Sequence, residues 1–194
     1  MAISFSERYR SKNTPWEINR PDEGVVKFIE SGLVEPCPAL DIGCGSGNNA
    51  IWLAGQGFQV TGIDRTKLAL AQARQKDEED LCHFIQADYL SKTIPGAPFA
   101  FIMDRGCFHH FRTTEERAAF ARKTAEIMAP AGVWLSLIGN RDETREGPGP
   151  PKLSATEICQ AVEPFFIIQS LNASHFDSDQ VPRARNWICH MEKR

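Results

Sequence analysis

Short apolar runs alternate with stretches of helical periodicity over most of the chain, and this pattern predicts strands separated by helices. The predicted strands are 39–42, 59–63, 83–86, 99–104 and 133–138, and the predicted helices between them include 48–54, 67–76 and 114–128. Strands joined by helices of this length form a parallel sheet with helices on both faces. The pattern therefore predicts an α/β fold.

Both ends of the chain depart from this alternation. Segments 165–171 and 184–191 are strand-like, and the polar segment between them has no helical pattern, so we expect an antiparallel hairpin at one end of the sheet. Residues 113–116 and 154–157 match the capping-box pattern, which predicts helices starting at about 114 and 155. Before the first strand, a polar and aromatic arm runs to about residue 20, and a short helix is expected after Pro21.

Composition limits the kinds of protein to consider. The 194 residues are 42% apolar, which suits a single domain over 1–194, either a monomer or a homodimer. A net charge of -3 with dispersed signs argues against nucleic acid or an anionic membrane as a partner. The six cysteines lie far apart and outside zinc-ligand spacing, so we expect no metal and a reduced, cytoplasmic protein. No apolar run approaches the length of a membrane span.

A glycine-rich turn follows the first predicted strand. Gly43, Gly45 and Gly47 give the spacing G-x-G-x-G, with Asp41 two residues ahead. Glycines bring bare backbone N–H groups up to a ligand, and the start of the next helix favours a negative group at the same place. The spacing differs from the dinucleotide pattern G-x-G-x-x-G and from a P-loop. On spacing alone, an ordinary tight turn remains an alternative.

Acidic residues stand at the ends of three other predicted strands. Asp64 is placed to accept hydrogen bonds from ribose hydroxyls, Asp88 could accept from an adenine amino group, and Asp104 lies beside the turn. Each acid alone could be a solvated residue or a helix N-cap. Together they predict a site for an adenosine with a zwitterionic tail, and S-adenosyl-L-methionine fits that description.

The motifs Asp41–Gly47, Asp64 and Ala87-Asp88 resemble the first three motifs of class I S-adenosylmethionine-dependent methyltransferases. The resemblance implies a Rossmann-like, seven-stranded, mostly parallel sheet with an antiparallel C-terminal hairpin, and S-adenosyl-L-homocysteine as the product. The cofactor-binding residues that it implies are Trp16, Arg20, Asp41, Gly43, Cys44, Gly45, Gly47, Asn48, Asp64, Arg65, Ala87, Asp88, Tyr89, Asp104 and Arg105.

Three further segments give a narrower resemblance. Residues 14–21, Asp104-Arg105-Gly106 and residues 149–154 are similar to the thiopurine S-methyltransferase superfamily, which includes thiol and halide methyltransferases and is close to tellurite-resistance methyltransferases. This resemblance implies a small-molecule acceptor with a soft heteroatom: sulfur, selenium, tellurium or a halide. Residues 107–110 depart from the superfamily, so the acceptor stays open. Alternatives are an oxygen, nitrogen or arsenic methyltransferase, and a non-catalytic module that binds the donor.

Roles for individual side chains follow from this resemblance. Arg105 and His109 are the candidate catalytic residues, and either His109 or His110 could take a proton. Trp16 would lie over the methionine part or the sulfonium, because an aromatic face attracts a cation, or serve as a core residue. Arg20 would bind the methionine carboxylate or the acceptor, or form a surface salt bridge. Residues 1–31 and 140–151 would cover the acceptor. The predicted substrate-binding residues are Trp16, Phe108, His109, Arg141 and Pro150.

Overall fold

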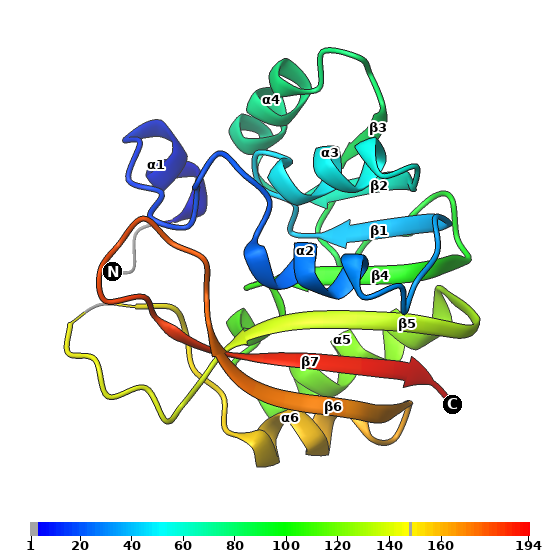
Figure 1. Cartoon of the computed structure of the whole chain (residues 1–194), viewed down its shortest axis with the longest axis vertical. Coiled ribbons are helices and arrows are strands. Elements are labelled where there is room, and N and C mark those ends of the chain that lie inside the picture. The colour runs from blue at the N-terminus through cyan, green and yellow to red at the C-terminus, as the bar shows by residue number, and fades with distance from the viewer. Residues whose placement is uncertain (1–3, 148) are drawn as a thin grey trace.

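A computed structural model describes residues 4–147 and 149–194 and shows a seven-stranded sheet covered by helices (Figure 1). The strands are β1 (Pro38–Ile42), β2 (Gln59–Asp64), β3 (Cys82–Gln86), β4 (Phe99–Arg105), β5 (Met128–Gly139), β6 (Phe166–His175) and β7 (Arg185–Lys193). The helices are α1 (Phe5–Arg10), α2 (Glu23–Glu30), α3 (Asn48–Gly55), α4 (Lys67–Lys76), α5 (Thr114–Glu126) and α6 (Ala155–Val162), with a 3-10 turn, η1 (Phe108–His110).

The strand order is β3-β2-β1-β4-β5-β7-β6. Strands β1 to β5 pair in parallel, whereas β7 pairs antiparallel with both β5 and β6. The predicted fold and its C-terminal hairpin are therefore confirmed. Since β2 and β4 lie on opposite sides of β1, the chain reverses its direction across the sheet there. Ligands of open α/β sheets bind outside the strand ends at such a point, and the glycine turn follows β1.

Each face of the sheet packs against its own helices. Successive side chains of a strand point to opposite faces, so Trp134 and Leu135 of β5 enter two different cores, and both are fully buried. Trp134 packs with Phe120 of α5 and Ile158 of α6, and Leu135 shares the other core with Val25 of α2. Most apolar side chains are thus used for packing, while the polar groups gather at the strand ends. Within the described residues, no helix combines the length and the apolar character needed to cross a bilayer.

Two elements differ from the predicted ones. The capping boxes of α5 and α6 form as expected, but α5 ends at Glu126, because the Ile127 carbonyl already accepts from the N–H of Phe99 at 2.9 Å. The apolar residues after Glu126 fit both a helix and a strand, and pairing with β4 decides between them. Helix α1 was not expected; it starts at a capping box between Ser4 and Glu7.

Candidate donor and acceptor site

The turn between β1 and α3 has positive φ at all three glycines: 73° at Gly43, 56° at Gly45 and 81° at Gly47. The N–H groups of Gly43 and Cys44 donate to the carbonyl of Ile63 at 2.8 and 2.9 Å. These bonds fix the turn against the end of β2. The predicted turn therefore sits at the sheet edge where the resemblance placed the donor.

Gly45 is the glycine that faces the N-terminal arm. A Cβ on Gly43 or Gly47 would approach packed side chains of the two cores to about 3 Å. A Cβ on Gly45 would instead lie 2.8 Å from the Tyr9 hydroxyl and 3.0 Å from Oε1 of Glu17. The room that the missing side chain of Gly45 leaves is thus filled by the arm.

Asp64 is held beside the turn, as predicted. Its Oδ2 accepts from the N–H of Gly45 at 3.1 Å and its Oδ1 from the N–H of Thr66 at 2.6 Å. Burial raises the pKa of this carboxyl, although the two bonds act in the opposite direction. The carbonyl of Asp64 accepts from the N–H of Ala87 at 3.1 Å, so the ends of β2 and β3 are tied together.

Two other predicted acids are buried more deeply. Burial, followed by the charges of Asp104 and Asp64, raises the pKa of Asp41 to about 8. Oδ2 of Asp41 has no hydrogen-bond partner among the described residues. Oδ1 of Asp104 accepts from Cys107 and Phe108, and its Oδ2 accepts from Trp134 Nε1 at 3.1 Å. The predicted donor-binding role of Asp104 is therefore wrong: its carboxylate is fully buried and holds the turn after β4.

The segment after β3 divides between surface and core. Asp88 is exposed, and its Oδ1 accepts from the N–H of Ser91 at 3.2 Å. Tyr89 points into the core, where its hydroxyl pairs with Thr124 at 2.9 Å, so its predicted donor contact is wrong. Arg65 is exposed and lies over the ring of Phe5 in the arm at 5.3 Å.

Glu17 carries the main polar contact between the arm and the turn. Its carboxylate accepts from the N–H of Ser46 at 3.3 Å, from the Ser46 hydroxyl, and from Nδ2 of Asn48 at 3.2 Å. The Tyr9 hydroxyl donates to the same carboxylate at 2.5 Å. Lys76 completes the cluster by donating to the Ser46 hydroxyl at 2.7 Å and to Asn48 Oδ1 at 2.8 Å.

Trp16 packs within the arm. Its ring contacts Phe5 and Tyr9 edge-on at 5.5 and 6.1 Å, and its Nε1 donates to the Tyr9 hydroxyl at 3.3 Å. Because that hydroxyl lies against Gly45, Trp16 is brought near the turn, and its contact with the donor remains a prediction. The guanidinium of Arg8 lies 5.6 Å from the centre of its ring.

Arg105, at the end of β4, is engaged on all three guanidinium nitrogens. Nε donates to Oδ2 of Asp22 at 2.5 Å, Nη1 to the Trp16 carbonyl at 3.2 Å, and Nη2 to the Asp177 carbonyl at 2.7 Å. The N–H of Asp177 also donates to Asp22, at 3.3 Å. The three nitrogens of Arg105 thus bind protein groups in this structure, and its predicted catalytic and donor-binding role remains a prediction. Arg105 joins β4, the arm and the β6–β7 loop.

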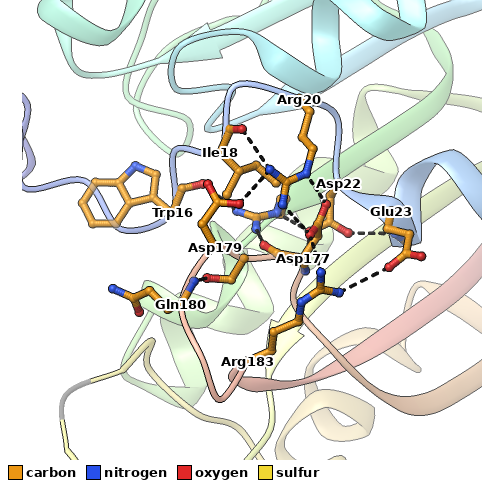
Figure 2. A network of polar contacts seen from close by, with 12 residues as sticks. Trp16, Ile18, Arg20, Asp22, Glu23, Asp177, Asp179, Gln180 and Arg183 are labelled. Carbon is orange, nitrogen blue, oxygen red and sulfur yellow. Dashed lines mark hydrogen bonds and ion pairs between the residues drawn. The ribbon is translucent and has the colours of Figure 1, made fainter.

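Arg20 continues the same network, which Figure 2 shows from close by. Its Nε and Nη2 donate to the two carboxylate oxygens of Asp177 at 3.0 and 2.8 Å, and its Nη1 donates to Asp179 at 2.8 Å. The structure shows the salt-bridge alternative for Arg20, and its predicted ligand-binding role remains a prediction. The arm and the β6–β7 loop lie at the edge toward which β1 points (Figure 1).

His109 cannot serve as the predicted base. Burial lowers its pKa well below the usual value, so the ring is neutral. Nδ1 accepts from the N–H of Gly139 at 2.8 Å, which leaves the ring proton on Nε2. Phe108 is fully buried between Phe120 and Trp134, so its predicted contact with the acceptor is also wrong.

The loop after β5 turns toward α6. Arg141 donates to Oε1 of Glu157 at 3.0 Å and to the Lys152 carbonyl at 3.4 Å, which directs it away from the predicted acceptor contact. Pro150 is half-buried. Sequence reasoning missed Glu17 and Asp177. Glu17 follows Trp16 within the motif of residues 14–21, and this position could have marked it as a candidate. The polar segment around Asp177 contains no motif that could have done so.

Comparisons with known proteins find a family and relatives similar to this chain. The family described as a methyltransferase domain matches residues 39–132. A probable thiol methyltransferase 2 from Arabidopsis thaliana is 26% identical over 165 residues, 83% of this chain and 72% of the relative. A 2-heptyl-1-hydroxyquinolin-4(1H)-one methyltransferase from Mycobacteroides abscessus is 26% identical over 162 residues, 81% of this chain and 70% of the relative.

Solved structures extend the likeness to nearly the whole chain. A structure described as "Conversion of a Disulfide Bond into a Thioacetal Group during Echinomycin Biosynthesis" has a TM-score of 0.82 at 25% identity and covers 97% of this chain and 87% of its own. The magnesium protoporphyrin IX methyltransferase of Synechocystis with bound S-adenosylmethionine has the same fold, with a TM-score of 0.68 at 16% identity, and covers 100% of this chain and 86% of its own. The chain is an S-adenosylmethionine-dependent methyltransferase.

Proposed function

We propose that this enzyme methylates a small molecule that brings its own soft nucleophile, with a thiolate as the first choice. The observation that carries the proposal concerns the groups after β4. His109 is neutral with Nδ1 engaged, both oxygens of Asp104 are engaged, and burial lowers the pKa of His110 to about 4. A general base works best when its pKa lies near the operating pH, so an acceptor that is already ionised suits this site.

The chemistry of the donor agrees with such an acceptor. In-line attack on the sulfonium neutralises its charge, so the enzyme mainly has to align nucleophile, methyl group and sulfur and exclude water. Alignment of this kind can supply roughly 7–11 kcal/mol of the barrier. A thiol with a pKa of about 8.5 is partly ionised near neutral pH. Burial raises the pKa of the Cys44 and Cys107 thiols well above the usual value, which argues against their acting as nucleophiles.

The donor is proposed to lie along the edge formed by the turn and the ends of β2 and β3. The turn and the start of α3 would take the methionine part, Asp64 the ribose hydroxyls, and Asp88 the adenine amino group. Loop 140–151 and the inner end of the arm, which Arg105 holds at the Trp16 carbonyl, would cover the acceptor side. The bond from the Gly45 N–H supports this role, because it holds the Asp64 carboxylate beside the turn.

Two of the similar proteins support sulfur as the reacting atom. One relative is named as a thiol methyltransferase, and the solved structure with the TM-score of 0.82 concerns the conversion of a disulfide bond into a thioacetal. An oxygen acceptor is the second candidate, because a relative of equal identity is named for a 1-hydroxyquinolin-4(1H)-one.

The test is the release of S-adenosylhomocysteine across a panel of small thiols of different pKa, hydrogen sulfide, iodide, selenite, tellurite, a thiopurine and a 1-hydroxyquinolone. We expect turnover with thiols, and a pH profile of kcat/KM whose inflection follows the pKa of each thiol. An inflection at the same pH for every thiol would show an enzymic base and contradict the proposal. Binding of S-adenosylhomocysteine without turnover of any compound would favour a non-catalytic module.

A further inference from the structure

We propose that the arm is a self-inhibiting latch, in which the Glu17 carboxylate occupies the place on the glycine turn that the carboxylate of S-adenosylmethionine takes when the donor binds. Among the turn glycines, Gly45 leaves room outside the two cores. Tyr9 and Glu17 fill that room, at 2.8 and 3.0 Å from the position of a Cβ on Gly45. A bound donor and this arm position therefore need the same space.

The polar groups under Glu17 form a site for a carboxylate. The N–H and hydroxyl of Ser46 and the amide of Asn48 all donate to it, and the ammonium of Lys76 stands behind both residues. Gly47 is the N-cap of α3 and offers no side-chain cap, and a negative charge is favoured at this end of the helix. The Glu17 carboxylate lies there through its bonds to Ser46, just before the N-cap, and to the side chain of Asn48, just after it.

The donor carries one anionic group, the carboxylate of its methionine part. A helix start with free N–H groups attracts such a group, and Glu17 already receives four hydrogen bonds, about as many as a carboxylate can accept. Glu17 thus has little capacity left to bind the donor ammonium in this position. Competition between two carboxylates for Ser46 and Asn48 follows from these contacts.

The outer part of the arm can detach from the glycine turn while the inner end stays bound. Its inner end is fixed by Arg105, which binds Asp22 and the Trp16 carbonyl. Its outer part stands beside the sheet (Figure 1), where α1 packs near α4. Phe5 packs against Arg65 and His110 at 5.3 and 5.0 Å, and the buried Tyr9 lies against Gly45. Breaking the Glu17 contacts would free residues 4–15 and the Glu17 side chain while Arg105 still holds the Trp16 carbonyl and Asp22. The inference concerns donor binding and does not depend on the acceptor.

Calorimetric titration with S-adenosylhomocysteine and limited trypsin digestion test the latch together. Glu17→Gln keeps the size of the side chain and removes its charge, and Glu30→Gln, on the exposed end of α2, removes the same charge away from the turn. We expect Glu17→Gln to bind S-adenosylhomocysteine about tenfold more tightly than the wild type does. The reason is that a smaller fraction of the variant has the arm on the turn, where it blocks the ligand. Glu30→Gln should match the wild type.

Trypsin reports the position of the arm through the exposed sites at Arg10 and Lys12. We expect S-adenosylhomocysteine to speed cleavage there in the wild type, and Glu17→Gln to be cleaved fast without ligand. Tyr9→Phe removes one hydrogen bond to Glu17 and no charge. It should raise both the affinity for S-adenosylhomocysteine and the rate of cleavage, but by less than Glu17→Gln does. Weaker or unchanged binding by the folded Glu17→Gln and Tyr9→Phe proteins, or protection of the arm by the ligand, would overturn the latch.

Discussion

The N–H of Gly45 donates to Oδ2 of Asp64 at 3.1 Å, so the turn after β1 and the acid at the end of β2 are joined. The two residues belong to neighbouring parallel strands whose registers align Ile42 with Ile63. Since Oδ1 of Asp64 also accepts from Thr66, at 2.6 Å, the orientation of the carboxylate is set by two backbone groups. The proposed ribose acid is thus preorganised, and its lone pairs that remain free are those a ligand can use.

Asp64→Ala tests that role. Hydrogen bonds to a charged group contribute about 1.5–3 kcal/mol each, so losing two to the ribose should weaken S-adenosylhomocysteine binding by at least about 100-fold. The fold should survive, because burial raises the pKa of this carboxyl. The buried negative charge therefore destabilises the folded protein, and the substitution removes it. Calorimetry gives the affinity and a thermal melt gives the fold. Unchanged affinity in a folded variant would refute the ribose role.

The features of the fold that the sequence predicts well depend on residues that are close to one another along the chain. Strand order, the glycine turn and the position of Asp64 follow from apolar periodicity, glycine spacing and the parallel connection. Capping at Thr113 and Ser154 was predictable for the same reason, because both partners lie within four residues.

The parts that sequence could not predict depend on distant partners or on side-chain direction. Arg105 meets Asp22 across 83 positions and Asp177 across 72, and no periodic pattern links these residues. Tyr89 and Phe108 lie just beyond strand ends. At such positions a shift of one residue decides whether a side chain points into the core or toward the edge where a ligand would bind. Both are apolar enough that core packing prevails.

Arg105→Met should destabilise the protein much more than Arg20→Met. The side chains of Arg105 and Asp22 are 14% and 1% exposed, and removal of one partner of a buried pair costs about 3–5 kcal/mol because the other charge stays buried. Arg20 is 41% exposed, and such pairs contribute about 0–1 kcal/mol. Urea denaturation of the two variants measures the difference. Equal losses would show that the two arginines are equivalent in holding the arm.

Asp41 gives the stability a pH dependence with a defined sign. Its pKa is about 8 in the folded protein, mainly because of burial, against about 3.9 in an unfolded chain. Between these values the unfolded chain has lost a proton that the folded chain keeps. The free energy of unfolding should therefore fall as the pH rises through this window, by up to about 1.4 kcal/mol per pH unit, and level off above it.

Asp41→Asn is neutral at every pH and lacks this slope. Denaturation of the wild type and the variant without donor, at about pH 5 and about pH 8, isolates the effect, because other titrating groups such as His109 are common to both proteins. The free energy of unfolding of the variant should rise relative to that of the wild type as the pH rises. Parallel pH profiles would mean that Asp41 is ionised in the folded protein throughout.

His109 provides the sharpest separation between a structural and a chemical role. Its Nδ1 accepts from the buried N–H of Gly139 at 2.8 Å. His109→Asn places an amide oxygen where it can still accept this bond, whereas His109→Phe leaves the N–H unsatisfied. We expect His109→Phe to lose about 1–3 kcal/mol of stability and His109→Asn to lose much less, with turnover of a thiol acceptor close to that of the wild type. Loss of a general base lowers a rate by about 10²–10⁴-fold. A fall of that size in a stable His109→Asn protein would restore His109 as the base and remove the main support for a pre-ionised acceptor.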